Sequence, residues 1–308
     1  MMFFGISPLR ARHVLAVSLS IILLGFAALL ALPAKAQEAF EPTRFSVEVV
    51  GEGPDVILIP GLSTTREVWR PHLGALEGHR IHLVQVRGFG EDAGVNAEGP
   101  IMNGLIAELA RYIEANGMEN PAIVGHSMGG FIAISLAADH PGLPGRIMIV
   151  DSLPWFAAIM VPPGTEPNMA QVEAQATAMR AMMLSMHGRD MPEGSNDALL
   201  SSYTIDQANL PRLRELTGDA DLRVTGQLAY ELMTSDMRQA IAAITVPATV
   251  VVPQNPAFGT EEATIAFYTQ QYDVLPNVEF EVISPAAHFV MVDQPAAFEA
   301  ALLDFLAD

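Results

Sequence analysis

The six residues Gly125–Gly130 (GHSMGG) constrain the fold more than any other part of the sequence. They join a short apolar run, Pro121–Val124, to a strongly apolar helical stretch, Phe131–His140. A turn this tight between a strand and a helix leaves no room for side chains two positions before and after its centre, and both positions are glycines, Gly125 and Gly129. The pattern predicts a strand–turn–helix unit whose central serine is exposed at the carboxyl end of a sheet and at a helix N-terminus.

The rest of the chain alternates short apolar runs with helical stretches, which indicates a mostly parallel sheet covered by helices on both faces. Beside the run before the turn, strands are expected at Val56–Ile59, His82–Val86, Arg146–Val150, Ala248–Val252 and Val278–Ile283. Helices are expected at Met102–Asn116 and Pro295–Leu306. Residues 152–240 contain no convincing β-run, so they are predicted to form a helical insert in an α/β chain.

The first 36 residues show the three parts of a secretory signal. A basic start is followed by the apolar stretch Val14–Leu32 and then by Ala34-Lys35-Ala36, a small-x-small cleavage pattern. The apolar stretch is also just long enough to span a bilayer as an uncleaved anchor. We expect cleavage after Ala36 and export, in a bacterium to the periplasm or the medium. Loss of the three basic residues of this segment would change the formal net charge from −19 to −22.

The composition excludes several classes of protein. With 16 Lys+Arg against 35 Asp+Glu, the surface repels nucleic acid and anionic lipid, so neither nucleic acid nor, once the signal is removed, a membrane is expected as a partner. The chain has no cysteine, which excludes a disulfide framework, a zinc–thiolate site and a thiol nucleophile. No metal-binding histidine pattern and no phosphate-binding loop with lysine occurs, so neither a metal nor a cofactor is expected.

Together with the serine turn, four other segments make the chain resemble the α/β-hydrolase superfamily. Ile59–Leu62 (IPGL) is similar to the family's first loop, with Pro60 where a histidine is usual, and Arg87–Gly90 (RGFG) is similar to a second turn. Ser284–Phe289 (SPAAHF) resembles the loop that carries the family's catalytic histidine, and Val292–Pro295 (VDQP) resembles the segment that follows it. The resemblance covers nearly all of residues 43–307, with the insert as its variable cap. It implies the α/β-hydrolase fold, with residues 37–151 and 241–308 as its core and residues 152–240 as a helical cap.

The resemblance also implies a mechanism. Ser127 would attack an acyl carbonyl, and His288 would accept the serine proton and later protonate the leaving group. The backbone N–H groups of Met128 and Leu62 would hold the oxyanion. His126 is adjacent to the serine, and we interpret it as a packing or supporting residue whose side chain points away from the hydroxyl.

The third member of the triad is missing from its usual position. The loop after Ala248–Val252 contains no carboxylate before Glu261 and Glu262, and these two residues resemble the first turn of a helix. In some branches of the family the acid instead follows the strand after the nucleophile helix, and Asp151 directly follows Arg146–Val150 here. Asp151 is therefore predicted to orient His288. Glu262 is the reserve candidate, and without either acid the site would be a weak dyad or inactive.

A serine nucleophile argues against dehalogenase and the usual epoxide hydrolase chemistry, which need aspartate at that position. The expected function is exported hydrolysis of carboxylic esters or lactones through an acyl-enzyme. A C–C bond hydrolase or a peptidase using the same serine, and a non-catalytic binding protein with this fold, stay open as alternatives. The insert indicates a small hydrophobic ester or acyl substrate, because one side of a predicted helix carries Val172, Ala176, Met179, Met182, Met183 and Met186.

Overall fold

The computed structural model describes residues 2, 40–162, 164–190, 192 and 194–307 of the chain. Apart from residue 2, the predicted signal segment lies outside the described residues. Within the part described, no helix is both long enough and apolar enough to cross a membrane.

A seven-stranded sheet runs through the described part of the chain, in the order β1-β3-β2-β4-β5-β6-β7. Its strands are β1 (Phe45–Val50), β2 (Asp55–Ile59), β3 (Arg80–Val86), β4 (Ala122–His126), β5 (Arg146–Val150), β6 (Ala248–Pro253) and β7 (Val278–Ile283). β1 pairs antiparallel with β3, and the other neighbouring strands are parallel. The six strands expected from the sequence are confirmed, and so is the mostly parallel sheet.

The antiparallel edge strand β1 was not expected from the sequence. Its residues alternate apolar and polar side chains, because only part of this edge strand is covered, and it has no continuous apolar run like those of the inner strands. Phe45 is fully buried at its start, whereas Val49 is half exposed. An edge strand of this kind gives a weaker signal than a strand buried on both faces.

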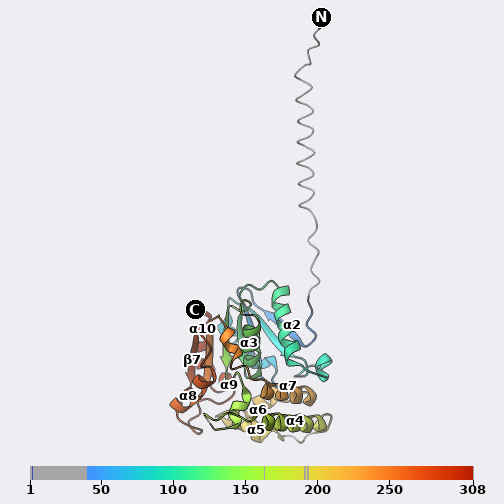
Figure 1. Ribbon diagram of the computed structural model, residues 1–308, viewed down its shortest axis with the longest axis vertical. Helices are drawn as coiled ribbons and strands as arrows, with labels where there is room; N and C mark the ends of the chain where they lie inside the picture. Colours follow the sequence, from blue (N-terminus) through green and yellow to red (C-terminus); the bar gives the residue numbers. More distant parts are fainter. Residues whose placement is uncertain (1, 3–39, 163, 191, 193, 308) are drawn as a thin grey trace. The chain divides into compact units, whose positions relative to one another are not determined.

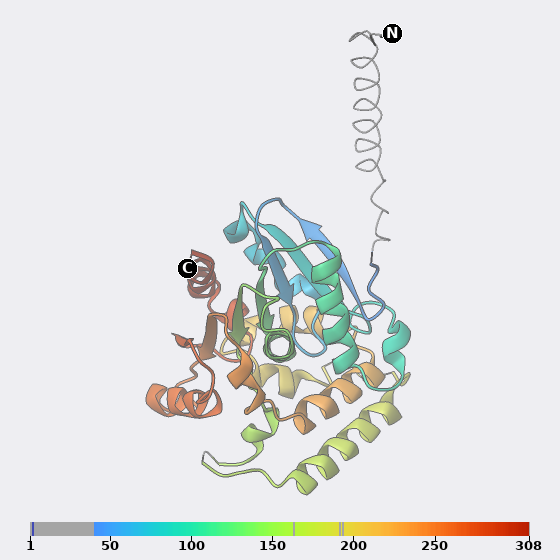
Figure 2. The same ribbon diagram turned by 45° about the horizontal axis from the view of Figure 1, so that its top comes forward.

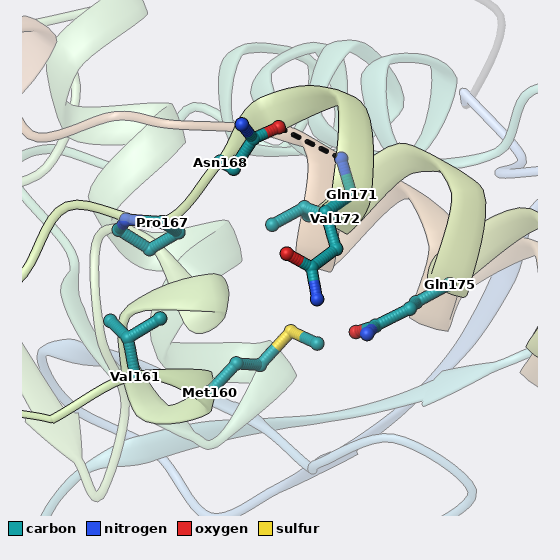
Figure 3. Close-up of a pocket in the computed structure, with 7 residues that line it drawn as sticks. All are labelled: Met160, Val161, Pro167, Asn168, Gln171, Val172 and Gln175. Atoms are coloured by element: carbon teal, nitrogen blue, oxygen red, sulfur yellow. Dashed lines mark hydrogen bonds between the residues drawn. The ribbon is translucent and has the colours of Figure 1, made fainter.

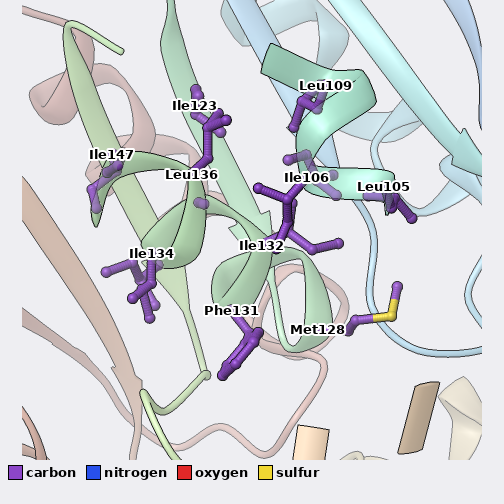
Figure 4. Packing of buried hydrophobic residues seen from close by; sticks show 14 of the residues in the cluster. Leu105, Ile106, Leu109, Ile123, Met128, Phe131, Ile132, Ile134, Leu136 and Ile147 are labelled. Carbon is purple, nitrogen blue, oxygen red and sulfur yellow. The ribbon is translucent and has the colours of Figure 1, made fainter. Parts of the chain in front are cut away.

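The buried strands divide their side chains between two hydrophobic clusters, one on each face of the sheet. On β2, Ile57 and Ile59 belong to the cluster that includes α2 (Met102–Ala115), α3 (Met128–Asp139) and α8 (Glu261–Gln271). Val56 and Leu58 belong to the opposite cluster, which includes α10 (Pro295–Ala307). Figure 4 shows Ile106 of α2 and Ile132 of α3 close together in the first of these clusters. Helices therefore cover both faces, as the alternating pattern predicts.

Between β5 and β6 the chain forms the helical insert. Its α-helices are α4 (Met169–Met186), α5 (Asp197–Ser202), α6 (Leu210–Thr217) and α7 (Leu222–Thr234). α4 lies against α7 over most of its length, and Figures 1 and 2 show the two helices side by side. The insert and the sheet domain together form one compact unit, Phe40–Asp308.

Candidate active site

Ser127 occupies a strained turn between β4 and α3. Its backbone angles are φ 53° and ψ −117°, a conformation that a residue with a side chain rarely adopts. Its N–H donates to the carbonyl oxygen of Val150 at 2.9 Å, which ties the turn to the end of β5. The residue is 6 % exposed, at the carboxyl end of the sheet and directly before the first residue of α3.

Two glycines make this turn possible, for the reason expected from the sequence. A Cβ on Gly125 would lie 2.1 Å from the carbonyl oxygen of Gly129. A Cβ on Gly129 would lie 2.2 Å from the carbonyl oxygen of Ile59, in the loop after β2. Real Cβ atoms do not approach backbone oxygens so closely, so any larger residue at either position would have to displace the backbone.

Asp151 and His288 are brought together from distant parts of the chain. Asp151 directly follows β5, and its Oδ2 lies 2.5 Å from Nδ1 of His288, in the loop after β7. Because Nδ1 is engaged by the carboxylate, Nε2 is the ring nitrogen left to face a substrate or a nucleophile. The two side chains are 17 % and 23 % exposed, so the pair is largely shielded from water while one side stays accessible.

The electrostatic surroundings keep Asp151 ionised. Burial alone would raise the pKa of its carboxyl group. The charge of His288 and the hydrogen bonds from His288 and Tyr268 outweigh that effect, and the pKa lies below its ordinary value. An ionised carboxylate at Nδ1 fixes the tautomer of the histidine and stabilises its protonated form.

Glu262, the reserve candidate for the acid, lies away from this pair. It is exposed in the first turn of α8, where its own backbone amide and, to a smaller extent, the Thr260 side chain lower its pKa. The loop where the acid is usual instead holds Gln254, whose side-chain oxygen accepts from Ser284 Oγ at 2.5 Å. The structure therefore pairs His288 with Asp151 and leaves Glu262 as a helix-terminal residue.

His126 supports the histidine loop. It is 1 % exposed, and its Nε2 donates to the carbonyl oxygen of His288 at 2.9 Å. Its ring also lies 4.6 Å from the ring of His288 and 5.1 Å from that of Phe289. Burial, with a smaller contribution from His288, lowers the pKa of His126 to about 3, so the ring is neutral and its Nε2 can carry the proton it donates.

Asp293 links the insert to the loop of His288, a role that the sequence did not reveal. Its carboxylate accepts from the backbone N–H of Ala287 at 2.9 Å and from Thr204 Oγ1 at 2.5 Å. It also accepts from the N–H of Ile205 and the side chain of Asn209. The sequence signal was the similarity of Val292–Pro295 to a family segment, which did not indicate these partners.

The two expected oxyanion donors belong to segments that converge on the serine. Met128 begins α3, and Leu62 follows Gly61 in the loop after β2. A Cβ on Gly61 would lie 3.2 Å from the Cβ of Ser127, so this loop approaches the serine closely. The backbone N–H of Leu62 is thus carried next to the turn, and that of Met128 lies at the N-terminus of α3.

Apolar side chains lie at the start of α3, which directly follows the serine. Met128 and Phe131 are buried, and Leu62 and Phe156 pack against the same cluster. The rings of Phe131 and Phe156 lie 6.3 Å apart, which places the first helical segment of the insert over the start of α3. The ring of Tyr203, also from the insert, lies 4.9 Å from that of His288.

The side of α4 predicted to be apolar is largely covered, and Met183 on this side lies against Gly226 of α7. Of the residues expected there, Val172 and Ala176 are buried, Met179, Met183 and Met186 are half-buried, and Met182 is 53 % exposed. A pocket of about 60 Å³ lies between the start of α4 and the preceding segment, lined by Met160, Val161, Pro167, Asn168, Gln171, Val172 and Gln175. Figure 3 shows the side-chain amides of Gln171 and Gln175 at this pocket. Ser127, Asp151 and His288 are not among its lining residues, so the pocket is separate from the serine site.

No group of three or more side chains that could hold a metal ion is found among the residues that the structure describes. The groups that the structure brings together at the site are a serine, a histidine–carboxylate pair and backbone N–H groups.

The chain matches the model of the Alpha/beta hydrolase family over residues 56–301. It is 25 % identical over 266 residues to a pimeloyl-[acyl-carrier protein] methyl ester esterase of Yersinia enterocolitica, an alignment that covers 83 % of this chain and 95 % of the relative. Among solved structures, it resembles an esterase from Exiguobacterium antarcticum with a TM-score of 0.70 and 19 % identity, over 88 % of this chain and 98 % of that one. It also resembles an enol-lactonase from Burkholderia xenovorans LB400 with a TM-score of 0.65 and 19 % identity, over 86 % and 96 % of the two chains.

Proposed function

Because the chain belongs to the Alpha/beta hydrolase family, we propose that it hydrolyses carboxylic esters or lactones with Ser127, His288 and Asp151 as a catalytic triad. The observation that carries the proposal is the hydrogen bond between His288 Nδ1 and Asp151 Oδ2. The bond from His126 to the carbonyl oxygen of His288 holds the loop of His288 next to the strained serine turn. A relative named as a methyl ester esterase, matched along most of both chains, also supports ester hydrolysis.

In the proposed reaction the oxygen of Ser127 attacks the carbonyl carbon, and its proton passes to Nε2 of His288. The oxyanion is held by the N–H groups of Met128 and Leu62. His288 then gives the proton to the leaving alkoxide, which departs as an alcohol and leaves an acyl-enzyme. A water molecule, deprotonated by His288, attacks the acyl-enzyme and releases the acid, and the proton returns to Ser127.

The proposed substrate carries an apolar group next to the scissile carbonyl. The support comes from Phe131, Phe156 and Leu62 near the start of α3. The methionines of α4 do not support this apolar surface, because the covered side of α4 packs on α7. A small apolar acyl or alkyl group therefore fits the proposal better than a long chain lying along α4.

The test compares wild type with Ser127→Ala, Asp151→Asn and Glu262→Gln. Each protein is incubated with a fluorophosphonate probe and with a panel of p-nitrophenyl esters and lactones. Wild type should be labelled and active, and Ser127→Ala should be neither. Asp151→Asn should lose about 10⁴-fold in kcat, because the histidine then takes the wrong tautomer.

Glu262→Gln is the matched control, since Glu262 is exposed on α8, and this variant should keep full activity. If Glu262→Gln lost activity and Asp151→Asn kept it, the assignment of the acid would be wrong. If wild type were neither labelled nor active on any ester or lactone, a non-catalytic binding role would be the better account.

Export is a separate proposal, and it rests on the signal pattern in residues 1–36 alone. Expression in a Gram-negative host, followed by fractionation and N-terminal sequencing, tests it. A periplasmic protein that begins at Gln37 is the expected result, and full-length protein retained in the cytoplasm would contradict it.

A further inference from the structure

Two tyrosines at the C-terminal end of α8, Tyr268 in the helix and Tyr272 directly after it, point their hydroxyl groups at the segment that follows β5. Tyr268 donates a hydrogen bond to Oδ1 of Asp151, and Tyr272 donates to the carbonyl oxygen of Ser152 at 2.8 Å. The two residues are four positions apart, so they lie on one side of the helix. Both side chains are buried, at 7 % and 1 % exposure. Two consecutive residues of the β5 loop are thus held by two hydroxyls from one helix.

The two oxygens of the Asp151 carboxylate have different partners. Oδ2 faces Nδ1 of His288, and Oδ1 accepts the hydroxyl of Tyr268. A carboxylate held at one oxygen alone can rotate about its terminal torsion, which has a broad energy minimum. A second bond at the other oxygen restricts that rotation, so Oδ2 stays directed at the imidazole.

The hydroxyl of Tyr268 keeps its proton and so remains a hydrogen-bond donor. Burial, with the nearby charge of Asp151, raises the pKa of Tyr268 well above its ordinary value, so the group stays protonated at neutral pH. In this buried position an unpaired carboxylate oxygen would be costly. The loop in which the acid is usual leads directly into α8, and here that loop lacks a carboxylate while its helix supplies a hydroxyl to the acid placed after β5.

We propose that Tyr268 is a positioning residue of the hydrolase, which holds the carboxylate of Asp151 in the orientation that His288 needs. The proposal rests on the triad proposed above. It assigns Tyr268 no contact with the substrate and no proton transfer. It predicts that loss of one hydroxyl on α8, well removed from the serine in the sequence, changes the acid–base behaviour of the site.

The variant Tyr268→Phe keeps the ring and removes the hydrogen bond. Its kcat should fall about 10-fold with KM nearly unchanged, since a hydrogen bond to a charged group is lost and the histidine is less well oriented. Without the donor, the carboxylate is more basic and stabilises the protonated imidazole more strongly. The acidic limb of the kcat/KM profile should therefore move to higher pH, by roughly half to one unit.

The variant Tyr272→Phe is the matched control, because it removes a buried hydroxyl at the end of the same helix, and this hydroxyl binds a backbone oxygen instead of the carboxylate. Both variants should lose thermal stability, but only Tyr268→Phe should move the acidic limb. An unchanged limb in Tyr268→Phe, or the same shift in both variants, would overturn the proposal and leave the triad intact.

Proton NMR gives a readout that needs no turnover. The proton shared by His288 Nδ1 and Asp151 should resonate far downfield in wild type and in Tyr272→Phe, and it should move or broaden in Tyr268→Phe. If wild type hydrolyses no ester, the proposed function fails, while this resonance still decides whether Tyr268 holds the carboxylate. A resonance that is identical in all three proteins would refute the role of Tyr268.

Discussion

Two residues of this site have strained backbone angles. Ser127 and Asp151 both have positive φ, at 53° and 43°, at the ends of the neighbouring strands β4 and β5. Such angles persist only where surrounding bonds hold them. For Ser127 the bond is to Val150, and for Asp151 it is from its own N–H to the carbonyl oxygen of Val251 at 3.0 Å. The sheet itself therefore holds the two residues in place.

The buried neutral His126 makes stability depend on pH. Its pKa falls from 6.5 to about 3 in the folded protein, so below pH 6.5 the unfolded chain takes up a proton that the folded protein does not. The contribution of His126 to the free energy of unfolding should therefore be complete above about pH 6.5 and should decrease as the pH falls toward 3. Between pH 6.5 and 4.5 this one histidine should account for a loss of about 2 kcal/mol.

The variant His126→Gln isolates this contribution. Glutamine stays neutral at every pH, and its amide N–H can replace the donor to the His288 carbonyl. Urea unfolding at several pH values should give a smaller loss of stability between pH 6.5 and 4.5 than in wild type, whatever the absolute stability of the variant. Equal losses in the two proteins would show that His126 is protonated in the folded state.

At the scale of secondary structure, the inner strands and the serine turn could be predicted, and the supporting contacts could not. Buried parallel strands are continuous apolar runs, and Gly125 and Gly129 identify the turn because they lie between a predicted strand and a predicted helix. The partners of Asp151 come from α8 and from the loop after β7, more than a hundred positions away along the chain. Nothing local in the sequence of α8 distinguishes Tyr268 from an ordinary buried tyrosine.

The spacing of apolar residues indicated which side of α4 is covered, but the sequence could not show what covers it. Apolar residues at helical spacing identify the side of a helix that packs, but not the element against which it packs. The contact of α4 is made with α7, and it depends on a glycine. A Cβ on Gly226 would lie 3.1 Å from the Cβ of Met183 and 3.4 Å from the Cα of Arg180. The two helices thus approach closely at one point, in the middle of α7.

The variant Gly226→Leu should separate these helices. Overpacking at a close contact costs about 1–3 kcal/mol, so the Tm should fall and α4 should open more often. Limited proteolysis with trypsin, followed by mass spectrometry, should show faster cleavage after Arg180. The control Gly142→Leu places the same side chain at an exposed glycine with nothing within 4 Å of its Cβ. Equal cleavage in both variants would mean that Gly226 does not hold α4 in place.

At the scale of the whole molecule, acidic residues outnumber basic ones, with 35 Asp+Glu against 16 Lys+Arg. The only lysine of the chain is Lys35, in the segment predicted to be removed, so every cation in residues 40–308 is an arginine. Several arginines are held by carboxylates, such as Arg70 by Glu48 and Glu67, and Arg238 by Glu166 and Asp236. The carboxylates outnumber these arginines, and the surplus carboxylates repel one another across the surface.

The protein that starts at Gln37 has a formal net charge of −22, because removal of the segment takes three basic residues from a chain of charge −19. This excess of negative charge predicts that salt stabilises the protein. The Debye length falls from about 30 Å at 0.01 M to about 8 Å at 0.15 M, so added NaCl screens repulsion between distant carboxylates before it weakens short ion pairs. Thermal unfolding at pH 7.5 should show a rise in Tm of roughly 2–4 °C over this range, equivalent to about 1 kcal/mol. The rise should level off above about 0.5 M, where screening is nearly complete. A Tm that falls with the first additions of NaCl would show instead that the arginine–carboxylate pairs outweigh the repulsion of the surplus acids.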